Sequence, residues 1–127
     1  MISIKQINEK DIDLCYELDL NTISLWSKKQ WSNEFKKEGT KIFGILITNL
    51  VIGICVFHVV LDEAQINYFV VNKNFRKKGF GSYLMSYLIR KYSKKFKIKA
   101  IVKYGNFIIP FLVFSHGRKR IIFKTKD

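Results

Sequence analysis

The sequence predicts an α+β domain, α/β in the broad sense, built on a mixed, mostly antiparallel central sheet with flanking helices. Three observations predict it: helical periodicity near the N-terminus and after the midpoint, strand-like runs of β-branched and aromatic residues over 41–71, and only short turns between those runs. With 127 residues, 48% of them hydrophobic, the chain is expected to form a single domain over 1–127 with a modest core.

The first two elements are a strand and a helix. Ile2, Ile4 and Ile7 loosely alternate with polar residues, which is typical of a short strand. Asn8 can cap a helix over 9–20, because its side chain can accept a hydrogen bond from a first-turn N–H group. Ile12, Cys15 and Leu18 then share an inward face, and the opposite, solvated face is formed by Asp11, Asp13 and Glu17.

A second helix is predicted by Ser27 and Gln30. They have the spacing of a capping box, in which each side chain bonds the backbone N–H of the other residue. The helix is expected to extend to about Glu38, and Gly39 is a natural stop.

Three strand-like runs follow, with short polar turns between them. An antiparallel meander is therefore expected. The runs cover residues 41–48, 51–61 and 65–71.

The second half contains a basic loop over 72–78, an amphipathic helix from 79 to about 93, and one more strand over 97–104. Beyond these elements the apolar residues show no clean period, and Pro110 argues against an unbroken helix or a central strand. The C-terminal part of the fold is expected to be missing or divergent.

Charge is strongly divided along the chain. Residues 1–63 contain 7 Lys and Arg against 9 Asp and Glu, a net of −2, whereas residues 64–127 contain 16 against 1, a net of +15. A field of this kind attracts polyanions, and composition leaves open nucleic acid, an anionic membrane surface or a phosphate-rich small molecule.

Composition also excludes some classes of protein. No apolar run reaches the roughly 18 residues that would cross a bilayer, and the N-terminus lacks the apolar stretch of a secretory signal. Cys15 and Cys55 are too far apart in the sequence to indicate a disulfide framework or a metal site. Reduced, buried thiols and a cytoplasmic location are expected, with no metal and no membrane partner.

The sharpest local feature is the turn between the last strand of the meander and the following helix, Phe75-Arg76-Lys77-Lys78-Gly79-Phe80-Gly81-Ser82. Its two glycines permit close backbone approach, and first-turn N–H groups point outward as donors. Together with the helix dipole and the mobile cations of the turn, they form an anion cradle suited to a pyrophosphate. The spacings GxGxxG and GxxxxGK[ST] are absent, which disfavours a dinucleotide-binding fold and a P-loop.

Residues 59–89, VVLDEAQINYFVVNKNFRKKGFGSYLMSYLI, resemble the central core of the GNAT N-acetyltransferases. The pattern R-x-x-G-x-G over 76–81 stands where that superfamily has its acetyl-CoA pyrophosphate motif. Within the superfamily the sequence looks most like the RimI-type ribosomal-protein-alanine N-acetyltransferases, with matches at 60–64 and at Trp26-Ser27. The resemblance covers residues 1–102.

The resemblance implies a set of cofactor contacts and an acceptor. Acetyl-CoA would be the co-substrate, and a protein or peptide N-terminus, such as that of a ribosomal protein, would be the acceptor. A strand N–H near Val71 would stabilise the oxyanion, and the loop around Trp26 would form one wall of the acceptor cleft, unless Trp26 is an ordinary core residue. The implied contacts are the backbone of Phe69, Val70 and Val71 for the pantetheine arm, Arg76, Lys77, Lys78, Gly79, Phe80, Gly81 and Ser82 for the pyrophosphate, and Asn106 as a further contact.

The catalytic residues do not match. The family uses a glutamate on the fifth strand as base and a later tyrosine as acid, but alignment places Lys103 or Ile101 at the glutamate position. The remaining candidates for proton transfer are Glu63 and Asp62, whose alternative role is that of turn residues, together with His58, His116 and Tyr104. The catalytic residues therefore stay unknown.

Two explanations of residues after 102 stay open. They form a divergent but selected structure, or they are translated out of frame. In codons GTG AAG TAC GGN, residues 102–105 would contain GAA GTA CGG, which encodes the family's Glu-Val-Arg in another frame. Reading the gene decides between the two explanations.

Three functions follow from these observations. The first is an acetyl-CoA-dependent protein N-acetyltransferase of RimI type, and the second is a catalytically impaired or frameshifted relative that still binds coenzyme A. The third is a basic nucleic-acid-binding module, in which Phe and Tyr interleave with Lys over 87–104.

Overall fold

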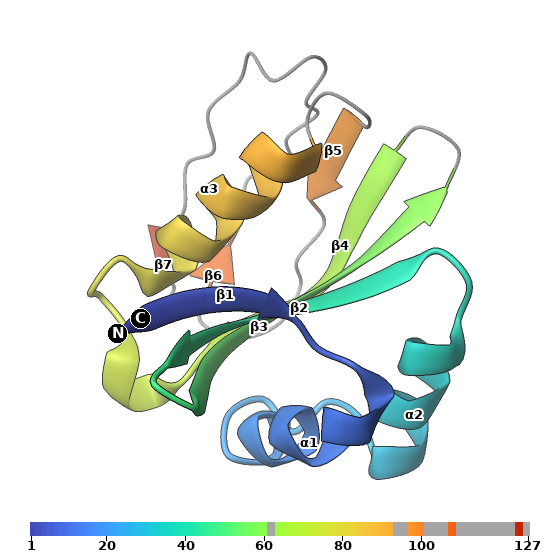
Figure 1. Ribbon diagram of the computed structural model, residues 1–127, viewed down its shortest axis with the longest axis horizontal. Coiled ribbons are helices and arrows are strands. Elements are labelled where there is room, and N and C mark those ends of the chain that lie inside the picture. The colour runs from blue at the N-terminus through green and yellow to red at the C-terminus, as the bar shows by residue number, and fades with distance from the viewer. Residues whose placement is uncertain (61–62, 93–96, 101–106, 109–123, 126–127) are drawn as a thin grey trace.

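Five strands form the central sheet of the computed structural model in the order β1-β2-β3-β4-β5 (Figure 1). The structure describes residues 1–60, 63–92, 97–100, 107–108 and 124–125. Strands β1 to β4 pair antiparallel and β5 pairs parallel to β4, so the predicted mixed, mostly antiparallel sheet is confirmed. The strands are β1 (Ile2–Gln6), β2 (Thr40–Ile47), β3 (Leu50–Val60), β4 (Glu63–Val71) and β5 (Lys97–Ala100).

Two short strands, β6 (Phe107–Ile108) and β7 (Lys124–Thr125), pair antiparallel in a second sheet. They come from the part of the chain for which the sequence predicted no clean period. The predicted strand over 97–104 is described only as far as Ala100, and its remainder lies outside the described residues.

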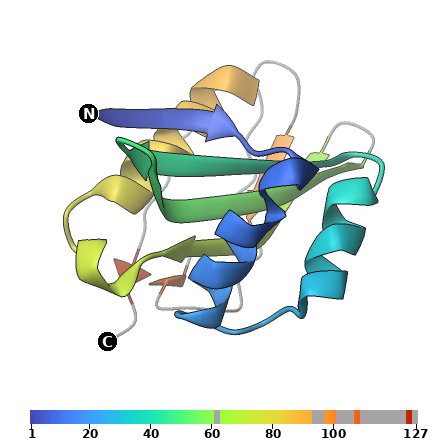
Figure 2. The same cartoon turned by 60° about the horizontal axis from the view of Figure 1, so that its bottom comes forward.

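Helices cover both faces of the central sheet. Helices α1 (Ile12–Leu20) and α2 (Lys28–Lys36) lie together on one face, and α3 (Phe80–Tyr92) lies on the other (Figures 1 and 2). Short 3-10 turns, η1 (Glu9–Asp11) and η2 (Lys73–Phe75), precede α1 and α3. No helix in the described ranges is both long and apolar enough to span a membrane.

The two predicted helix starts have different outcomes. At α2 the capping box is present, with Gln30 N donating to Ser27 Oγ at 3.1 Å and Ser27 N donating to Gln30 Oε1 at 2.8 Å. The Asn8 side chain makes no cap hydrogen bond, because the chain enters a 3-10 turn there before the α-helix begins. Helix α2 ends at Lys36, and Gly39 follows with a φ of 86°.

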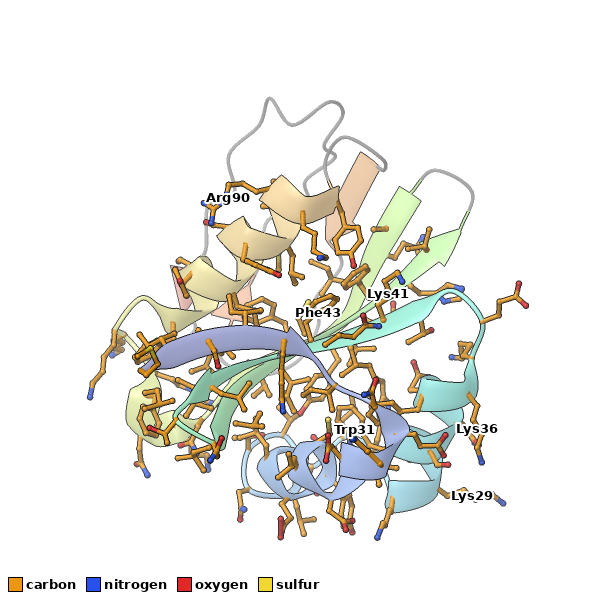
Figure 3. All side chains as sticks on the ribbon, viewed as in Figure 1. Lys29, Trp31, Lys36, Lys41, Phe43 and Arg90 are labelled. Carbon is orange, nitrogen blue, oxygen red and sulfur yellow. The ribbon has the colours of Figure 1, made fainter. Side chains whose placement is uncertain are left out.

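The sheet separates two hydrophobic cores, because successive strand residues point to opposite faces. Phe43 packs on the α3 side, whereas its neighbour Ile42 packs with Trp31 on the side of α1 and α2. Figure 3 shows Trp31 and Phe43 on opposite sides of the sheet. Each core contains one buried free thiol, Cys15 in the α1 and α2 core and Cys55 in the α3 core.

Strand β4 carries an irregularity between its two halves. Val56 pairs with Tyr68 while the next residue of β3, Phe57, pairs with Ile66, so Asn67 is the extra residue of a β-bulge. On the other side of β4, the pairing with β5 runs from Glu63 to Ile66. The bulge therefore lies where the described β4–β5 pairing ends.

The buried thiols predict a loss of stability at alkaline pH. Burial, followed by the negative charges of Asp11 and Asp19, raises the pKa of Cys15 from 9.0 to about 12. The folded state therefore keeps a proton that the unfolded chain releases, so this contribution is complete below pH 9.0 and is lost as pH rises toward about 12. At about pH 10 the loss from Cys15 alone is expected to be about 1.4 kcal/mol.

Urea unfolding of the wild type and of Cys15→Ala at about pH 8 and about pH 10 measures this contribution. The variant should lose less stability between the two pH values, because it lacks one ionisable group that the unfolded chain exposes. Lysine deprotonation is common to both proteins and cancels in the comparison. Equal losses in the two proteins would contradict the prediction.

Candidate functional site

The C-terminal half of β4 presents its backbone in two directions. Asn72 N donates to Ile52 O at 2.7 Å, and Gly53 pairs with Val71. Because the direction alternates along an antiparallel strand, the N–H and C=O groups of Val70 face β3, whereas those of Phe69 and Val71 point away from β3. The resemblance implied that Val70 offers its backbone groups to a ligand. The structure differs, because these groups already bond to β3.

The turn after β4 is held by local hydrogen bonds. Asn72 accepts from the backbone N–H of Asn74 at 2.9 Å through its side chain. Arg76 Nε donates to the carbonyl oxygen of Val71 at 2.9 Å. Arg76 is therefore anchored to the end of β4 rather than being the mobile cation that the sequence predicted, because the turn folds its side chain back onto the strand.

Two residues of the turn have left-handed backbone conformations, Lys77 with a φ of 62° and Gly79 with a φ of 87°. Glycine adopts this conformation without a steric cost. A Cβ atom at Gly79 would meet nothing within 4 Å, so the backbone there borders open space. Lys77, Lys78 and Gly79 are all exposed.

Helix α3 begins beside this open space. Its first backbone bond joins Tyr83 N to Gly79 O at 2.9 Å, so the N–H groups of Phe80, Gly81 and Ser82 precede the first helical hydrogen bond. The Phe75 ring packs against Phe80, with centroids 6.2 Å apart, and fixes the entry into the helix.

The stretch 64–92 carries six Lys and Arg and no Asp or Glu. Outward N–H donors, adjacent cations and room beside the Gly79 backbone fit a pyrophosphate group.

The candidate base Glu63 lies at the wrong end of the strand. It is the first residue of β4 and pairs with Val60 and Lys97. Val71 lies eight residues further along β4, roughly 26 Å away at about 3.3 Å per residue. Glu63 and the Val71 N–H therefore lie at opposite ends of β4. The positions aligned with the family's base, Ile101 and Lys103, and the candidate contact Asn106 lie outside the described residues.

The buried carboxylate of Asp19 bonds to β4 on the face that packs against α1 and α2. It was not among the residues predicted from the sequence. Its side chain accepts four hydrogen bonds, from Leu25 N at 3.0 Å, Trp26 N at 2.9 Å, Trp31 Nε1 at 3.0 Å and Tyr68 Oη at 2.9 Å. Asp19 stands four residues after the buried Cys15, on the same face of α1. That spacing was the available signal that this carboxylate is not solvated.

An aromatic cluster surrounds this carboxylate. The rings of Trp26 and Tyr68 have centroids 5.1 Å apart, and Trp31 lies 4.8 Å from Trp26 and 5.1 Å from Tyr68. Burial and the negative charge of Asp19 raise the pKa of Tyr68, so its hydroxyl stays protonated as a donor. Trp31 is fully buried, whereas Trp26 is only half-buried and borders the surface.

Residues 7–107 match the family model described as Acetyltransferase (GNAT) family. The resemblance that residues 59–89 predict is thereby confirmed. No curated protein matches the chain.

Solved structures of similar fold include two ribosomal-protein-alanine N-acetyltransferases, the type of enzyme that the sequence resembles. The ribosomal-protein-S18-alanine N-acetyltransferase from Escherichia coli has a TM-score of 0.72 and 20% identity, over 79% of this chain and 66% of that one. The ribosomal-protein-alanine N-acetyltransferase from Brucella melitensis biovar Abortus 2308 has a TM-score of 0.69 and 13% identity, over 81% and 80%. The PaiA N-acetyltransferase from Thermoplasma acidophilum, in complex with coenzyme A, has a TM-score of 0.63 and 13% identity, over 87% and 80%. The chain thus spans just under two thirds of the E. coli protein.

Proposed function

Because the chain belongs to the GNAT family of acetyltransferases, whose acyl donor is acetyl-CoA, we propose that it acetylates the N-terminal amine of a protein or peptide. One observation carries the proposal. The backbone of Val71 points away from β3 immediately before the turn that leads to the open N-terminus of α3. A carbonyl-binding N–H and a pyrophosphate cradle are therefore adjacent on one edge of the molecule.

In this proposal each part of the turn has a separate task. Lys77 and Lys78 neutralise the pyrophosphate, and the N–H groups of residues 80–82 donate to its oxygens. The backbone groups of Phe69 and Val71 face the side of β4 on which a pantetheine arm can add like a strand. Arg76 keeps the end of β4 in place through its bond to the Val71 carbonyl.

Acetyl-CoA supplies a thioester whose carbonyl carbon is attacked by the amine. The Val71 N–H is placed to donate to the carbonyl oxygen as negative charge develops on it. The new C–N bond forms as the C–S bond breaks, the amine loses a proton, and coenzyme A leaves as the thiol.

The acceptor must be neutral to react. An α-amine has a pKa of about 8, so a useful fraction is neutral near that pH without a strong base, whereas a lysine side chain with a pKa of about 10.4 is almost fully charged. This difference favours an N-terminal acceptor for a chain whose aligned base position holds Lys103 or Ile101. The names of the E. coli and Brucella proteins support a ribosomal protein that begins with alanine.

Two further parts of the proposal concern the surroundings of the reaction. The two buried free thiols suit a reducing compartment, so we place the reaction in the cytoplasm. The basic turn has a sufficient reason in the pyrophosphate, so nucleic acid is not part of the proposed function.

The test is acetyl transfer to a short peptide with an N-terminal alanine. We expect mass spectrometry to find the acetyl group on the α-amine, at a rate that rises with pH through about 8 as the amine loses its proton. The control is the same peptide with a blocked N-terminus and one internal lysine, which should not react. Transfer to that lysine instead would contradict the proposed acceptor.

A coenzyme A-binding protein without catalytic activity is the second candidate, favoured by the absence of a glutamate at the aligned base position. Isothermal titration with acetyl-CoA, read together with the transfer assay, separates it from the alternatives. Binding without transfer would select this candidate, and the absence of binding would reject the cofactor site.

A further inference from the structure

Asp19 is a buried titratable group that the proposed reaction does not use. It has no exposed surface. Burying a carboxylate is unfavourable unless hydrogen bonds or a cation compensate it. In the described ranges its compensation consists of hydrogen bonds alone, since the ion pairs found there involve Asp13, Glu9 and Glu34.

The four donors to Asp19 come from three different parts of the fold. Two are the backbone N–H groups of Leu25 and Trp26, in the loop over 21–27 that joins α1 to α2. The third is on α2, at Trp31, and the fourth is on β4, at Tyr68. One carboxylate therefore fixes the α1–α2 loop to both the helix and the sheet.

The main chain of Asp19 holds the same loop. Its carbonyl oxygen accepts from Thr22 N at 3.0 Å and from Ser24 N at 2.6 Å. Ser24 has a φ of 55°, a left-handed conformation that a non-glycine residue adopts only when its surroundings require it. The loop thus folds back over the last turn of α1 and places Trp26 against the sheet.

Trp26 packs against the part of β4 that the proposed reaction uses. Its ring packs on Tyr68, with centroids 5.1 Å apart. Tyr68 is the neighbour of Phe69, whose backbone, like that of Val71, points away from β3 toward the proposed acyl-donor side. The position of the half-buried Trp26 ring is therefore set relative to the strand that would hold the thioester.

We propose that Asp19 is a positioning residue, which holds Trp26 against β4 as a wall of the acceptor cleft. The inference rests on the proposed function. Asp19 acts on the acceptor through the loop and touches neither substrate, so its loss should weaken use of the acceptor while leaving acetyl-CoA binding intact.

Asp19→Asn tests the inference. The variant keeps the size of the side chain, but an NH2 group replaces one carboxylate oxygen. This group cannot accept the hydrogen bonds that the oxygen accepted. We expect KM for an N-terminal alanine peptide to rise about tenfold, because small displacements of a positioning group have large effects. KM for acetyl-CoA should stay unchanged, and amide hydrogen exchange at Leu25 and Trp26 should become faster.

Two control variants isolate the effect. Asp13→Asn changes an exposed carboxylate on the same helix, paired with Lys28, and should alter neither KM nor exchange in the loop. Ile45→Ala removes buried volume from the α3 core, so it lowers stability without touching the loop. Its acceptor KM should stay at the wild-type value. A rise in Ile45→Ala equal to that in Asp19→Asn would overturn the inference, since the effect would then be a general loss of stability.

Trp26→Ala keeps the test decisive if Asp19→Asn does not fold. It leaves every bond to Asp19 in place, because Trp26 contributes a backbone N–H. The acceptor KM should rise about as much as for Asp19→Asn. An unchanged acceptor KM in an active protein would overturn the inference alone, whereas a wild type that acetylates no peptide would overturn the proposed function and the wall together.

Discussion

Replacing Trp31 by alanine is expected to lower the free energy of unfolding by about 3–5 kcal/mol. Trp31 is fully buried and packs against the rings of both Trp26 and Tyr68. The substitution leaves a cavity in the α1 and α2 core. It also removes the Nε1–H donor that lies 3.0 Å from the Asp19 carboxylate, which weakens the compensation of a buried charge. Urea unfolding near neutral pH measures the loss.

Two matched variants divide the effect into its parts. Trp31→Phe keeps an aromatic ring but lacks the N–H donor, so its loss of stability should be intermediate. Trp26→Ala truncates the other tryptophan, which is only half-buried, and should cost clearly less than Trp31→Ala. If Trp31→Ala and Trp26→Ala lower the free energy of unfolding by the same amount, the prediction that Trp31 is the core residue of the pair is wrong.

Gly79→Ala is expected to abolish most of the thermal stabilisation that acetyl-CoA gives to the wild type. The left-handed conformation at Gly79, with a φ of 87°, costs an alanine about 1–2 kcal/mol. An alanine that relaxes out of this conformation turns the N–H groups of Phe80 and Gly81 away from the pyrophosphate. Open space beside Gly79 means that the free protein should suffer only the conformational cost. The shift of Tm with acetyl-CoA concentration measures the loss.

Gly39→Ala is the control for this prediction. Gly39 has nearly the same φ, 86°, and lies immediately before β2, where an added Cβ would approach Val59 O to 2.8 Å. The variant should therefore lose at least as much stability as Gly79→Ala while keeping the stabilisation by acetyl-CoA. A full acetyl-CoA shift in Gly79→Ala would place the pyrophosphate elsewhere.

Those parts of the fold that depend on local pattern could be predicted from the sequence. The strand predicted over 51–61 is β3, Leu50–Val60, because β-branched residues between polar turns specify a strand through their own side chains. The capping box at Ser27 is equally local, since both partners lie within one helical turn. The basic turn over 75–82 was predictable for the same reason.

Features that depend on contacts between distant residues could not be predicted. The donors to Asp19 lie between 6 and 49 residues away in the sequence, so no spacing indicates that they meet. The resemblance implied Val70 together with Phe69 and Val71, because a sequence motif does not reveal the register with β3, which decides where each N–H points. Arg76 was expected to be mobile, because its bond to the Val71 carbonyl depends on how the turn folds.

The two cysteines make each layer of the molecule separately observable by chemistry. Cys15 lies on the buried face of α1, and Cys55 lies on β3 in the core beneath α3, on the opposite side of the sheet. Burial raises the pKa of both thiols. A thiol reagent attacks the thiolate, so each cysteine becomes reactive only when its own layer opens. The alkylation rate of Cys15 therefore reports the opening of the layer that contains α1, and that of Cys55 reports the opening of the layer that contains α3. A ligand that binds the start of α3 should slow alkylation of Cys55 more than alkylation of Cys15.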